Sequence, residues 1–369
     1  LAAEFGWSNS QLGLNFTITL SVFCISGFVS GLISKKTTPR ARLLLSAALI
    51  FLGFFISSRL QGAIGVLYLA YGVLAGTAIG FAYNTIIGVV TAWFPDKRGL
   101  ASGLLLMGFG LNSILIGRVA ANMMNNPAIG WRNTFFLSAV VTAAVLAAAA
   151  CIIKSPPKDL ILPEPKRRET KETGEPARDY TAGEMVRRWS FWKLFIFFFL
   201  LASVGSASIS FAKNIILDID GSDNFATTMV GVISMANGFG RIVSGWLFDI
   251  IGRRKTQFVT SGVAILAPLV VILALSARSL ALGAVGLILC GIAYGFAPTG
   301  STAFIGAFFG QKNFSMNLGI LNLQLIATSF ASTWAGAIKD ATGSFTMTFV
   351  ILTGFSVVGL VLNYFIKKP

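Results

Sequence analysis

Apolar residues in this chain are grouped into long blocks that are separated by short polar segments. Most blocks reach about 20 residues, the length at which a helix spans the hydrocarbon core of a bilayer. We expect eleven such helices, at residues 12–33, 43–58, 63–92, 99–123, 132–153, 192–215, 226–248, 257–277, 280–308, 315–338 and 344–366. The pattern therefore predicts an all-α membrane protein.

The composition agrees with a protein that crosses the membrane many times. The chain is 55% hydrophobic and only 12% charged, with a mean hydropathy of +0.77. Its net charge of +15 could suit nucleic acid, but the basic residues are dispersed among the loops between apolar blocks. Orientation in the membrane explains them better, so we expect no nucleic-acid binding.

Lysine and arginine are concentrated in alternate loops. The basic loops contain Lys35, Lys36, Arg40 and Arg42, then Lys97 and Arg98, nine basic residues from Lys154 to Arg188, then Arg253, Arg254, Lys255, Lys312, Lys367 and Lys368. Such loops stay in the cytoplasm, so the C-terminus is expected inside and Leu1 outside. An odd number of spans then predicts one more helix before Leu1. We expect twelve spans in all, in a bacterial cytoplasmic membrane.

The segment 154–188 interrupts the apolar pattern. It has 16 charged residues among 35 and several prolines, which predicts a flexible cytoplasmic linker. A regulatory or partner-binding segment is the alternative. The linker divides the chain into an N-terminal helical bundle at 1–153, without its expected first helix, and a C-terminal six-helix bundle at 189–369.

The two parts on either side of the linker resemble each other. Val29–Arg40 matches Val243–Arg254 with a shift of 214, and Gly130–Val140 matches Gly343–Thr353 with a shift of 213. A nearly constant shift indicates a duplicated bundle with the same orientation in each half. Parallel repeats of six spans are one design of transporters, which bind substrate near the midplane between the halves.

Arg241 is the most informative residue for function. It lies within Thr227–Phe248, which is otherwise uncharged, and eight residues before Asp249, or roughly 12 Å inside the membrane. A charge at that depth costs about 2.5–3.5 kcal/mol and normally faces a polar cavity. A guanidinium stays charged and binds a carboxylate through two parallel hydrogen bonds. We expect substrate binding; the alternative is a permanent tether to helix carbonyls or to a hidden acid, although no predicted span has a deep Asp or Glu.

Five other polar residues have depths that bracket the bilayer centre, roughly 12–20 Å from a membrane surface. They are Tyr83, Asn112, Asn322 and Tyr294, with Asn237 one turn outward from Arg241 on the same helix face. Their similar depths predict a single polar cavity. For the two tyrosines, aromatic packing is an equal alternative on the sequence alone.

Other residues within the spans are expected to be structural. Counting residues along each span places three cations at its external end, where a long side chain can reach the membrane surface: Arg118, Lys213 and Lys339. Three cysteines lie in apolar stretches and are expected to be packing residues: Cys24, Cys151 and Cys290. Two small-residue stripes predict close helix packing: Gly72, Gly76 and Gly80, then Gly99, Gly103 and Gly108.

Three segments carry a family resemblance that covers essentially the whole chain. Gly245–Arg254 resembles the loop signature of the major facilitator superfamily, and its first-half copy has Lys35 in place of the Asp and Thr38 in place of the Gly. Trp93–Gly103 resembles the oxalate/formate antiporter branch, which is related to the monocarboxylate transporters. Ala236–Arg241 resembles the segment with the substrate arginine in both groups. The resemblance implies a major facilitator type two-half helical bundle, with eleven of twelve spans visible.

The resemblance also implies roles for site residues. Tyr83 and Tyr294 fall on tyrosine positions that line the substrate pocket, and Asn237 stands where animal monocarboxylate transporters carry an Asp. The oxalate exchanger has a second deep cation, a Lys, where this chain has Leu325, and a Trp where it has Asn322. A pocket with one fixed cation leaves the second charge of a dicarboxylate unpaired. We therefore expect monocarboxylates such as lactate or pyruvate.

Together these features predict a secondary active transporter of small monocarboxylates that works by alternating access. Proton symport is favoured slightly over an oxalate/formate-type organic anion antiporter, although Arg241 does not deprotonate. A channel or an enzyme is disfavoured, because no filter-like ring, nucleophile–base pair or metal cluster stands out and the chain has no His. The predicted substrate-binding residues are Arg241, Tyr83, Tyr294, Asn237, Asn322 and Asn112. We expect no cofactor or metal. The expected partners of a monomeric protein are a small monocarboxylate anion, a proton and membrane lipid.

Overall fold

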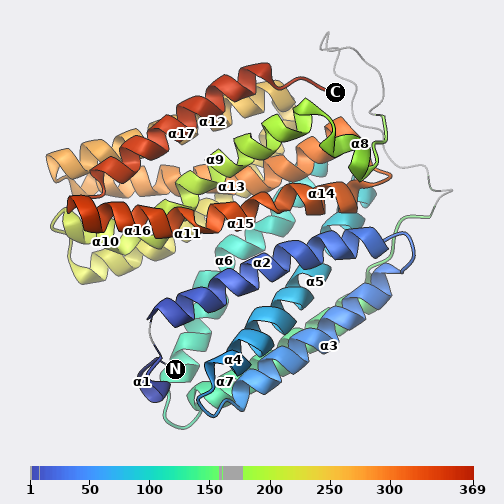
Figure 1. The fold of residues 1–369 in the computed structure, drawn as a ribbon, viewed down its shortest axis with the longest axis horizontal. Coiled ribbons are helices and arrows are strands. Elements are labelled where there is room, and N and C mark those ends of the chain that lie inside the picture. Colours follow the sequence, from blue (N-terminus) through green and yellow to red (C-terminus); the bar gives the residue numbers. More distant parts are fainter. Residues whose placement is uncertain (1, 8, 158–159, 161–177) are drawn as a thin grey trace. The chain divides into compact units, whose positions relative to one another are not determined.

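A computed structural model describes residues 2–7, 9–157, 160 and 178–369, except for the side chains of 2, 3, 9, 10, 13, 113–115 and 118. Within these ranges the chain is helical and has no β-strand (Figure 1). The helices are α1 Ala2–Phe5, α2 Asn9–Ile33, α3 Pro39–Ser58, α4 Ile64–Leu67, the π-helix η1 Tyr68–Ala75, α5 Gly76–Trp93, α6 Arg98–Asn125, α7 Gly130–Ile152, α8 Ala182–Val186, α9 Trp189–Ser210, α10 Ala212–Asp218, α11 Asp223–Ile251, α12 Arg253–Ala277, α13 Leu280–Phe309, α14 Phe314–Asn322, α15 Gln324–Ser329, α16 Ala331–Thr342 and α17 Thr346–Phe365.

Each predicted span coincides with a long helix or with a consecutive series of helices. Among the described residues, nine stretches are long and apolar enough to cross a membrane: Leu14–Ile33, Pro39–Ser58, Ile64–Trp93, Gly130–Ile152, Trp189–Ser210, Arg253–Ala277, Leu280–Phe309, Phe314–Thr342 and Thr346–Phe365. The other two predicted spans are α6, with 28 residues, and α11, with 29 residues, which carries Arg241. The prediction of an all-α membrane protein is confirmed.

Three spans are less regular than their apolar pattern. The span predicted at 63–92 contains the π-helical stretch η1 between α4 and α5. The one predicted at 315–338 is divided into α14, α15 and α16. The one predicted at 192–215 breaks at Phe211, between α9 and α10. Because every piece remains apolar, hydropathy cannot reveal such breaks.

The helices form two compact units. Unit 1 comprises Leu1–Trp93, Ile116–Leu162 and Gln311–Ile326. In it, α2 packs on α5 and α14, while α3 packs on α5 and α7. A Cβ added at Gly76 would lie 2.9 Å from the Thr19 carbonyl oxygen, so the predicted small-residue stripe at Gly72–Gly80 does permit a close approach of helices.

Unit 2 comprises Phe94–Leu115, Pro163–Gly310 and Ala327–Pro369. The helix α13 packs on α9, α11 and α12, and α17 packs on α9 and α12. One core cluster of this unit is buried and apolar and includes Val204, Ile215, Met229, Val271, Leu287 and Phe349. The helix α6 begins in unit 2 and ends in unit 1.

The described end of the predicted linker is structured. Tyr180 is buried, and its backbone N–H donates to the Phe309 carbonyl at 2.9 Å. At the start of α8, Thr181 and Glu184 cap each other through backbone and side chain. Hydrogen bonds from the Thr181 backbone and hydroxyl lower the pKa of the Glu184 carboxyl. This end therefore differs from the flexible segment expected, while 158–159 and 161–177 lie outside the described residues. The division into bundles at 1–153 and 189–369 stays a prediction.

Two of the three cysteines pack as predicted. Cys24 and Cys290 are buried. Cys151 is exposed on the outside of α7, so the prediction that it fills a packed interior is wrong. Its apolar sequence neighbours reflect a helix that is only sparsely buried, since 11% of the apolar window of α7 lies inside the protein.

Candidate functional site

Arg241 is buried in unit 2 and bound to two helices. The residue is only 7% exposed to solvent. Nε donates to the Asn237 side-chain oxygen at 3.2 Å, one turn away on α11, and Nη1 donates to the Leu106 carbonyl of α6 at 2.9 Å. The guanidinium carbon lies 5.5 Å from the centroid of the Phe109 ring. Asn237, which the sequence placed one turn from Arg241 on the same helix face, thus holds the arginine.

Glycines let two helices, α6 and α13, approach the backbone of α11 around Arg241. A Cβ at Gly103 of α6 would lie 2.5 Å from the Arg241 carbonyl oxygen. A Cβ at Gly295 of α13 would collide with the Asn237 carbonyl oxygen and lie 2.8 Å from the Arg241 nitrogen. Contacts this short exclude any side chain, so α11 is held between α6 and α13 at the level of the arginine.

The predicted glycine stripe on α6 needs one correction. Gly99 and Gly103 do pack against α11, but a Cβ at Gly108 would meet nothing within 4 Å. The third close contact comes from Gly110, whose Cβ would lie 2.5 Å from Gly238 Cα. Gly110 stands seven residues after Gly103, two helical turns on the same face, whereas Gly108 points elsewhere.

Two other predicted site residues lie in unit 2. Tyr294 is half-buried on α13, directly before Gly295, and its ring occupies the space that a side chain at Gly205 of α9 would fill. Asn112 is exposed near the middle of α6, two turns beyond Leu106. The structure therefore brings Arg241 and Asn237 together and places the residue after Tyr294 against them.

The remaining two predicted residues belong to unit 1. Tyr83 is half-buried on α5 and packs edge-on against Phe23 of α2, with ring centroids 5.3 Å apart. Asn322 is 6% exposed at the last residue of α14. Leu325 is half-buried just after it. Whether these residues share a cavity with Arg241 stays a prediction.

Sequence reasoning missed three groups near the candidate residues. The Leu106 carbonyl is a backbone acceptor, and because every residue has one, the residue type does not predict its role. Phe109 is one of 32 phenylalanines, so its position over a cation had no signal. Asn84 is fully buried beside Tyr83, donates to the Ser315 carbonyl at 2.8 Å, and has a side-chain oxygen with no hydrogen-bond partner within the described structure. Its depth, one residue past Tyr83, could have marked it.

The loop signature that follows Arg241 caps a helix. Asp249, near the end of α11, accepts hydrogen bonds from the backbone N–H groups of Gly99 at 3.2 Å and Leu100 at 2.8 Å, in the first turn of α6. A carboxylate at a helix N-terminus satisfies free N–H groups and interacts favourably with the helix dipole. The contact anchors α6 to α11 within unit 2.

Unit 1 contains the degenerate copy of that cap. Lys35, which replaces the aspartate, donates through Nζ to the side-chain oxygen of Asn313, the N-cap residue of α14. A Cβ at Gly31 would lie 2.6 Å from Met316 Cα, so α2 and α14 approach closely here. The cation binds the cap side chain because a helix N-terminus offers N–H donors, which a lysine cannot accept from.

Two of the three expected anchor residues form ion pairs. Lys213 pairs with Asp223 at 2.7 Å, and Lys339 pairs with Asp218, all within unit 2. Lys213 lies in the first turn of α10 and Lys339 in the last turn of α16, and their position at the membrane surface stays a prediction. The side chain of Arg118, the third expected anchor, lies outside the described structure.

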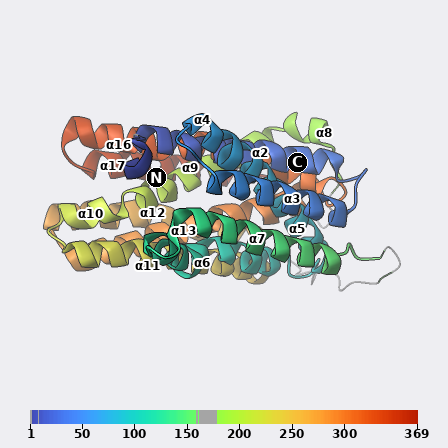
Figure 2. The ribbon, with the colours of Figure 1, turned by 90° about the horizontal axis from the view of Figure 1, so that it is seen from below.

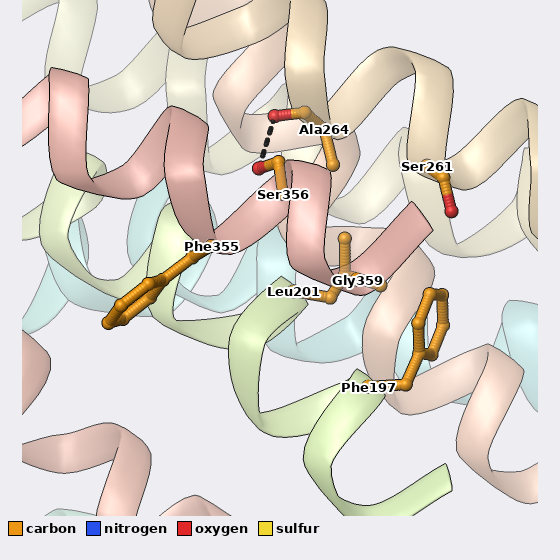
Figure 3. A pocket seen from close by; sticks show the side chains of 7 residues that line it. All are labelled: Phe197, Leu201, Ser261, Ala264, Phe355, Ser356 and Gly359. Atoms are coloured by element: carbon orange, nitrogen blue, oxygen red, sulfur yellow. Dashed lines mark hydrogen bonds between the residues drawn. The ribbon is translucent and has the colours of Figure 1, made fainter. Parts of the chain in front are cut away.

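A small pocket lies elsewhere in unit 2, among α9, α12 and α17 (Figure 3). Its lining residues are Phe197, Leu201, Ser261, Ala264, Phe355, Ser356 and Gly359. The Ser356 hydroxyl donates to the Ala264 carbonyl at 2.8 Å across it. None of the predicted substrate-binding residues lines this pocket.

Comparison with known proteins shows a consistent family signal. Residues 1–324 match the model of the Major Facilitator Superfamily. The MFS-type transporter YhjX of Escherichia coli K12 is 28% identical over 88% of this chain and 77% of its own length. The oxalate:formate antiporter of Oxalobacter formigenes is 25% identical over 84% of this chain and 75% of its own. Monocarboxylate transporter 13 of Bos taurus is 24% identical over 90% of this chain and 74% of its own.

Solved structures share the fold at low sequence identity. The fucose:proton symporter FucP of Escherichia coli superposes with a TM-score of 0.75 at 14% identity, covering 98% of this chain and 92% of its own. The proton:xylose symporter XylE gives a TM-score of 0.75 at 13% identity, covering 98% and 87%. The two-half helical bundle expected from the sequence fits these neighbours.

Proposed function

The chain belongs to the Major Facilitator Superfamily and is a multi-pass membrane transporter, and we propose that it carries small monocarboxylates such as lactate or pyruvate by alternating access. Its similarity to an oxalate:formate antiporter and to monocarboxylate transporter 13 supports an organic anion as substrate. The single observation that carries the proposal is the buried guanidinium of Arg241.

The hydrogen bonds of Arg241 suit a carboxylate ligand. Asn237 holds Nε on one side, which fixes the plane of the guanidinium. Nη1 is bound to a neutral acceptor, the Leu106 carbonyl. A carboxylate is the stronger acceptor, because hydrogen bonds between two charged groups are roughly twice as strong as neutral ones.

We infer that the substrate exchanges with the Leu106 carbonyl. In the empty transporter the carbonyl stabilises the buried cation, and on binding the carboxylate takes over Nη1 and neutralises the charge. Phe109, whose ring lies over the guanidinium, then contacts the apolar part of a small substrate. Because α6 loses one bond to α11 in this exchange, substrate binding favours relative motion of these two helices.

One fixed cation favours one carboxylate. The position at which the oxalate exchanger is expected to carry a second cation is Leu325 here, half-buried after Asn322. A second carboxylate would then lie in the pocket without a counter-charge, at a cost of several kcal/mol. Tyr83, Tyr294, Asn322 and Asn112 complete the proposed pocket as neutral hydrogen-bonding groups.

Proton symport is the favoured coupling, and organic anion antiport of the oxalate/formate type is the second candidate. Symport requires a group that titrates, and Arg241 does not deprotonate. The predicted spans have no deep Asp, Glu or His. In a symporter of this chain the proton would therefore travel with the substrate or on a group outside these spans. An exchanger requires no such group, and the similarity to the Oxalobacter protein favours it.

The proposed setting follows from the charge asymmetry of the loops. The basic loops and the C-terminus face the cytoplasm of a bacterial cell. As a separate part of the proposal, the chain acts as a monomer in the cytoplasmic membrane. The bundles at 1–153 and 189–369 rock about the bound anion.

Reconstituted vesicles distinguish the two couplings. In a symporter, an inward proton gradient drives uptake of labelled L-lactate into empty vesicles. In an exchanger, acidifying the outside has no effect, and uptake requires vesicles preloaded with another carboxylate. In either case unlabelled pyruvate should compete better than oxalate; preference for oxalate would contradict the single-carboxylate pocket.

A further inference from the structure

One end of unit 2 brings together basic residues from distant parts of the sequence. Arg187 and Arg188 immediately precede α9, whereas Lys367 and Lys368 follow α17. Figures 1 and 2 both show the end of α17 beside α8. The Lys193 ammonium of α9 donates to the Phe365 carbonyl at 3.1 Å, which fixes this junction.

Several of these cations have no acidic partner among the described residues. Within the described structure, Arg187, Lys193 and Lys367 form no ion pair. Arg188 lies over a ring, with its guanidinium carbon 5.7 Å from the Tyr180 centroid. Glu184, the nearest acid in the sequence, is already paired with Arg178 at 2.9 Å. The junction therefore presents positive charge to an outside anion.

Exposed aromatic rings surround the same junction. Trp189 is 79% exposed and Tyr364 is 62% exposed. Trp192 donates its indole N–H to the Val186 carbonyl at 2.8 Å, which ties α8 to the start of α9. Tryptophan and tyrosine at the ends of membrane helices favour the level of the lipid headgroups. The rings thus place the basic junction where headgroup phosphates lie.

The pocket of Figure 3 is lined by residues of α9 and α17, the two helices whose ends form this junction. On α9, Phe197 and Leu201 follow Lys193 by four and eight residues, so all three lie on one face, roughly 6 and 12 Å deeper. On α17, the pocket is lined by Gly359, six residues before Phe365. The lining of this small pocket is mostly apolar, and its polar residues are Ser261 and Ser356.

Buried polar groups lie between the charges and the apolar pocket. Asn363, 3% exposed, stands one turn after Gly359 and donates to the Ser261 hydroxyl at 3.5 Å. Gln257, 4% exposed, stands one turn before Ser261 on α12, and its Nε2 has no hydrogen-bond partner within the described structure. Buried donors are normally satisfied. An ester carbonyl at this depth would accept from Gln257.

We propose that this end of unit 2 is a binding site for one anionic phospholipid. The phosphate lies among the cations of the junction, which are Arg187, Arg188, Lys193, Lys367 and Lys368. The glycerol ester region lies near Gln257, and one acyl chain lies along α17 over the small pocket beside Gly359. Net negative charge on the headgroup is what distinguishes the ligand from bulk lipid, since each basic residue near such a surface contributes roughly a fivefold preference.

The test is quenching of Trp189 by brominated lipid in reconstituted protein. Bilayers of unlabelled phosphatidylcholine receive increasing fractions of one brominated lipid, either phosphatidylglycerol or phosphatidylcholine. In both of these lipids the acyl chains are brominated near the glycerol. The difference between wild type and Trp189→Phe isolates this ring among the seven tryptophans. We expect half-maximal quenching at a severalfold lower fraction of the brominated phosphatidylglycerol.

Two independent variants separate a site from general lipid contact. Replacing Arg187, Arg188, Lys367 and Lys368 by glutamine removes the charge, and Gly359→Leu fills the pocket; each should abolish the preference. Gly359→Ala is the matched control and should retain it, because its Cβ would lie 3.8 Å from Phe197, an ordinary contact. A protease-accessible tag after Pro369 verifies unchanged topology. Equal quenching by both lipids in wild type, or a preference that survives both changes, would overturn the proposal.

Discussion

At the scale of single residues, the account depends on how a buried arginine is stabilised. Arg241 has an amide oxygen at 3.2 Å and a backbone carbonyl at 2.9 Å, so the charge is solvated by protein dipoles. The sequence placed Asn237 one turn from Arg241 on the same helix face, which agrees with their hydrogen bond. It could not predict Leu106 or Phe109, because contacts between two helices depend on their relative rotation.

Asn237 offers a direct test of the exchange mechanism. We expect Asn237→Asp to raise the KM for lactate by about ten- to hundredfold, because a carboxylate one turn away would pair with Arg241 and compete with substrate. Uptake kinetics in vesicles measure this. Asn224→Asp, at the exposed start of the same helix, is the matched control and should leave KM unchanged. An unaltered KM in Asn237→Asp would show that the substrate binds elsewhere.

Leu325 tests the basis of substrate choice. A lysine there adds the second cation that a dicarboxylate requires, so Leu325→Lys should increase the ratio of oxalate to lactate uptake by about tenfold or more. Leu325→Met keeps the volume without the charge and should preserve the wild-type ratio. If the lysine variant remains folded and its ratio does not change, the side chain at 325 does not face the substrate.

At the scale of elements, glycines determine how closely helices pack. Hydropathy located every span, because lipid exposure constrains the composition of each helix. It gave no sign of the π-helical η1 or of the breaks around α15, since these depend on backbone geometry rather than on polarity. The small-residue stripe on α6 was assigned correctly at Gly99 and Gly103 but not at Gly108, because spacing alone does not identify the face that meets α11.

The contact between α6 and α11 gives a stability prediction. A Cβ at Gly245 would collide with the backbone of Gly99, so Gly245→Ala should separate these helices and cost roughly 1–3 kcal/mol. Gly231→Ala, on the same helix with nothing within 4 Å, should be neutral or stabilising. Melting temperatures in detergent compare the two. Equal melting temperatures would mean that this approach is not required in the folded state.

The helix caps differ in charge between the two halves. Asp249→Asn should weaken the bonds to Gly99 and Leu100 and speed amide exchange in the first turn of α6, by an amount equivalent to about 0.5–2 kcal/mol. Lys35→Asp should have the opposite effect on α14, since it restores an acceptor for free N–H groups. Hydrogen exchange with mass spectrometry reports both. No change in α6 in the Asn variant would contradict the role of the charge.

At the scale of the whole molecule, duplication explains the pattern of conserved geometry and altered chemistry. The repeats shifted by 214 residues place Gly31 and Gly245 at equivalent close contacts. Only the second copy retains the aspartate cap and carries the buried arginine. The family and its fold followed from spans, loop charge and three short segments. The shared cavity did not, because it depends on how the halves are placed about each other.

The most direct test is uptake of labelled L-lactate into proteoliposomes by wild type, Arg241→Ala and Arg241→Lys, with and without an inward proton gradient. Arg59→Ala, an exposed cation of unit 1, is the control. We predict that Arg241→Ala lowers uptake at least about a hundredfold and that the lysine variant recovers only part of it, because it lacks the planar fork. The control should transport normally. Full lactate uptake by a folded Arg241→Ala variant would contradict carboxylate binding at Arg241.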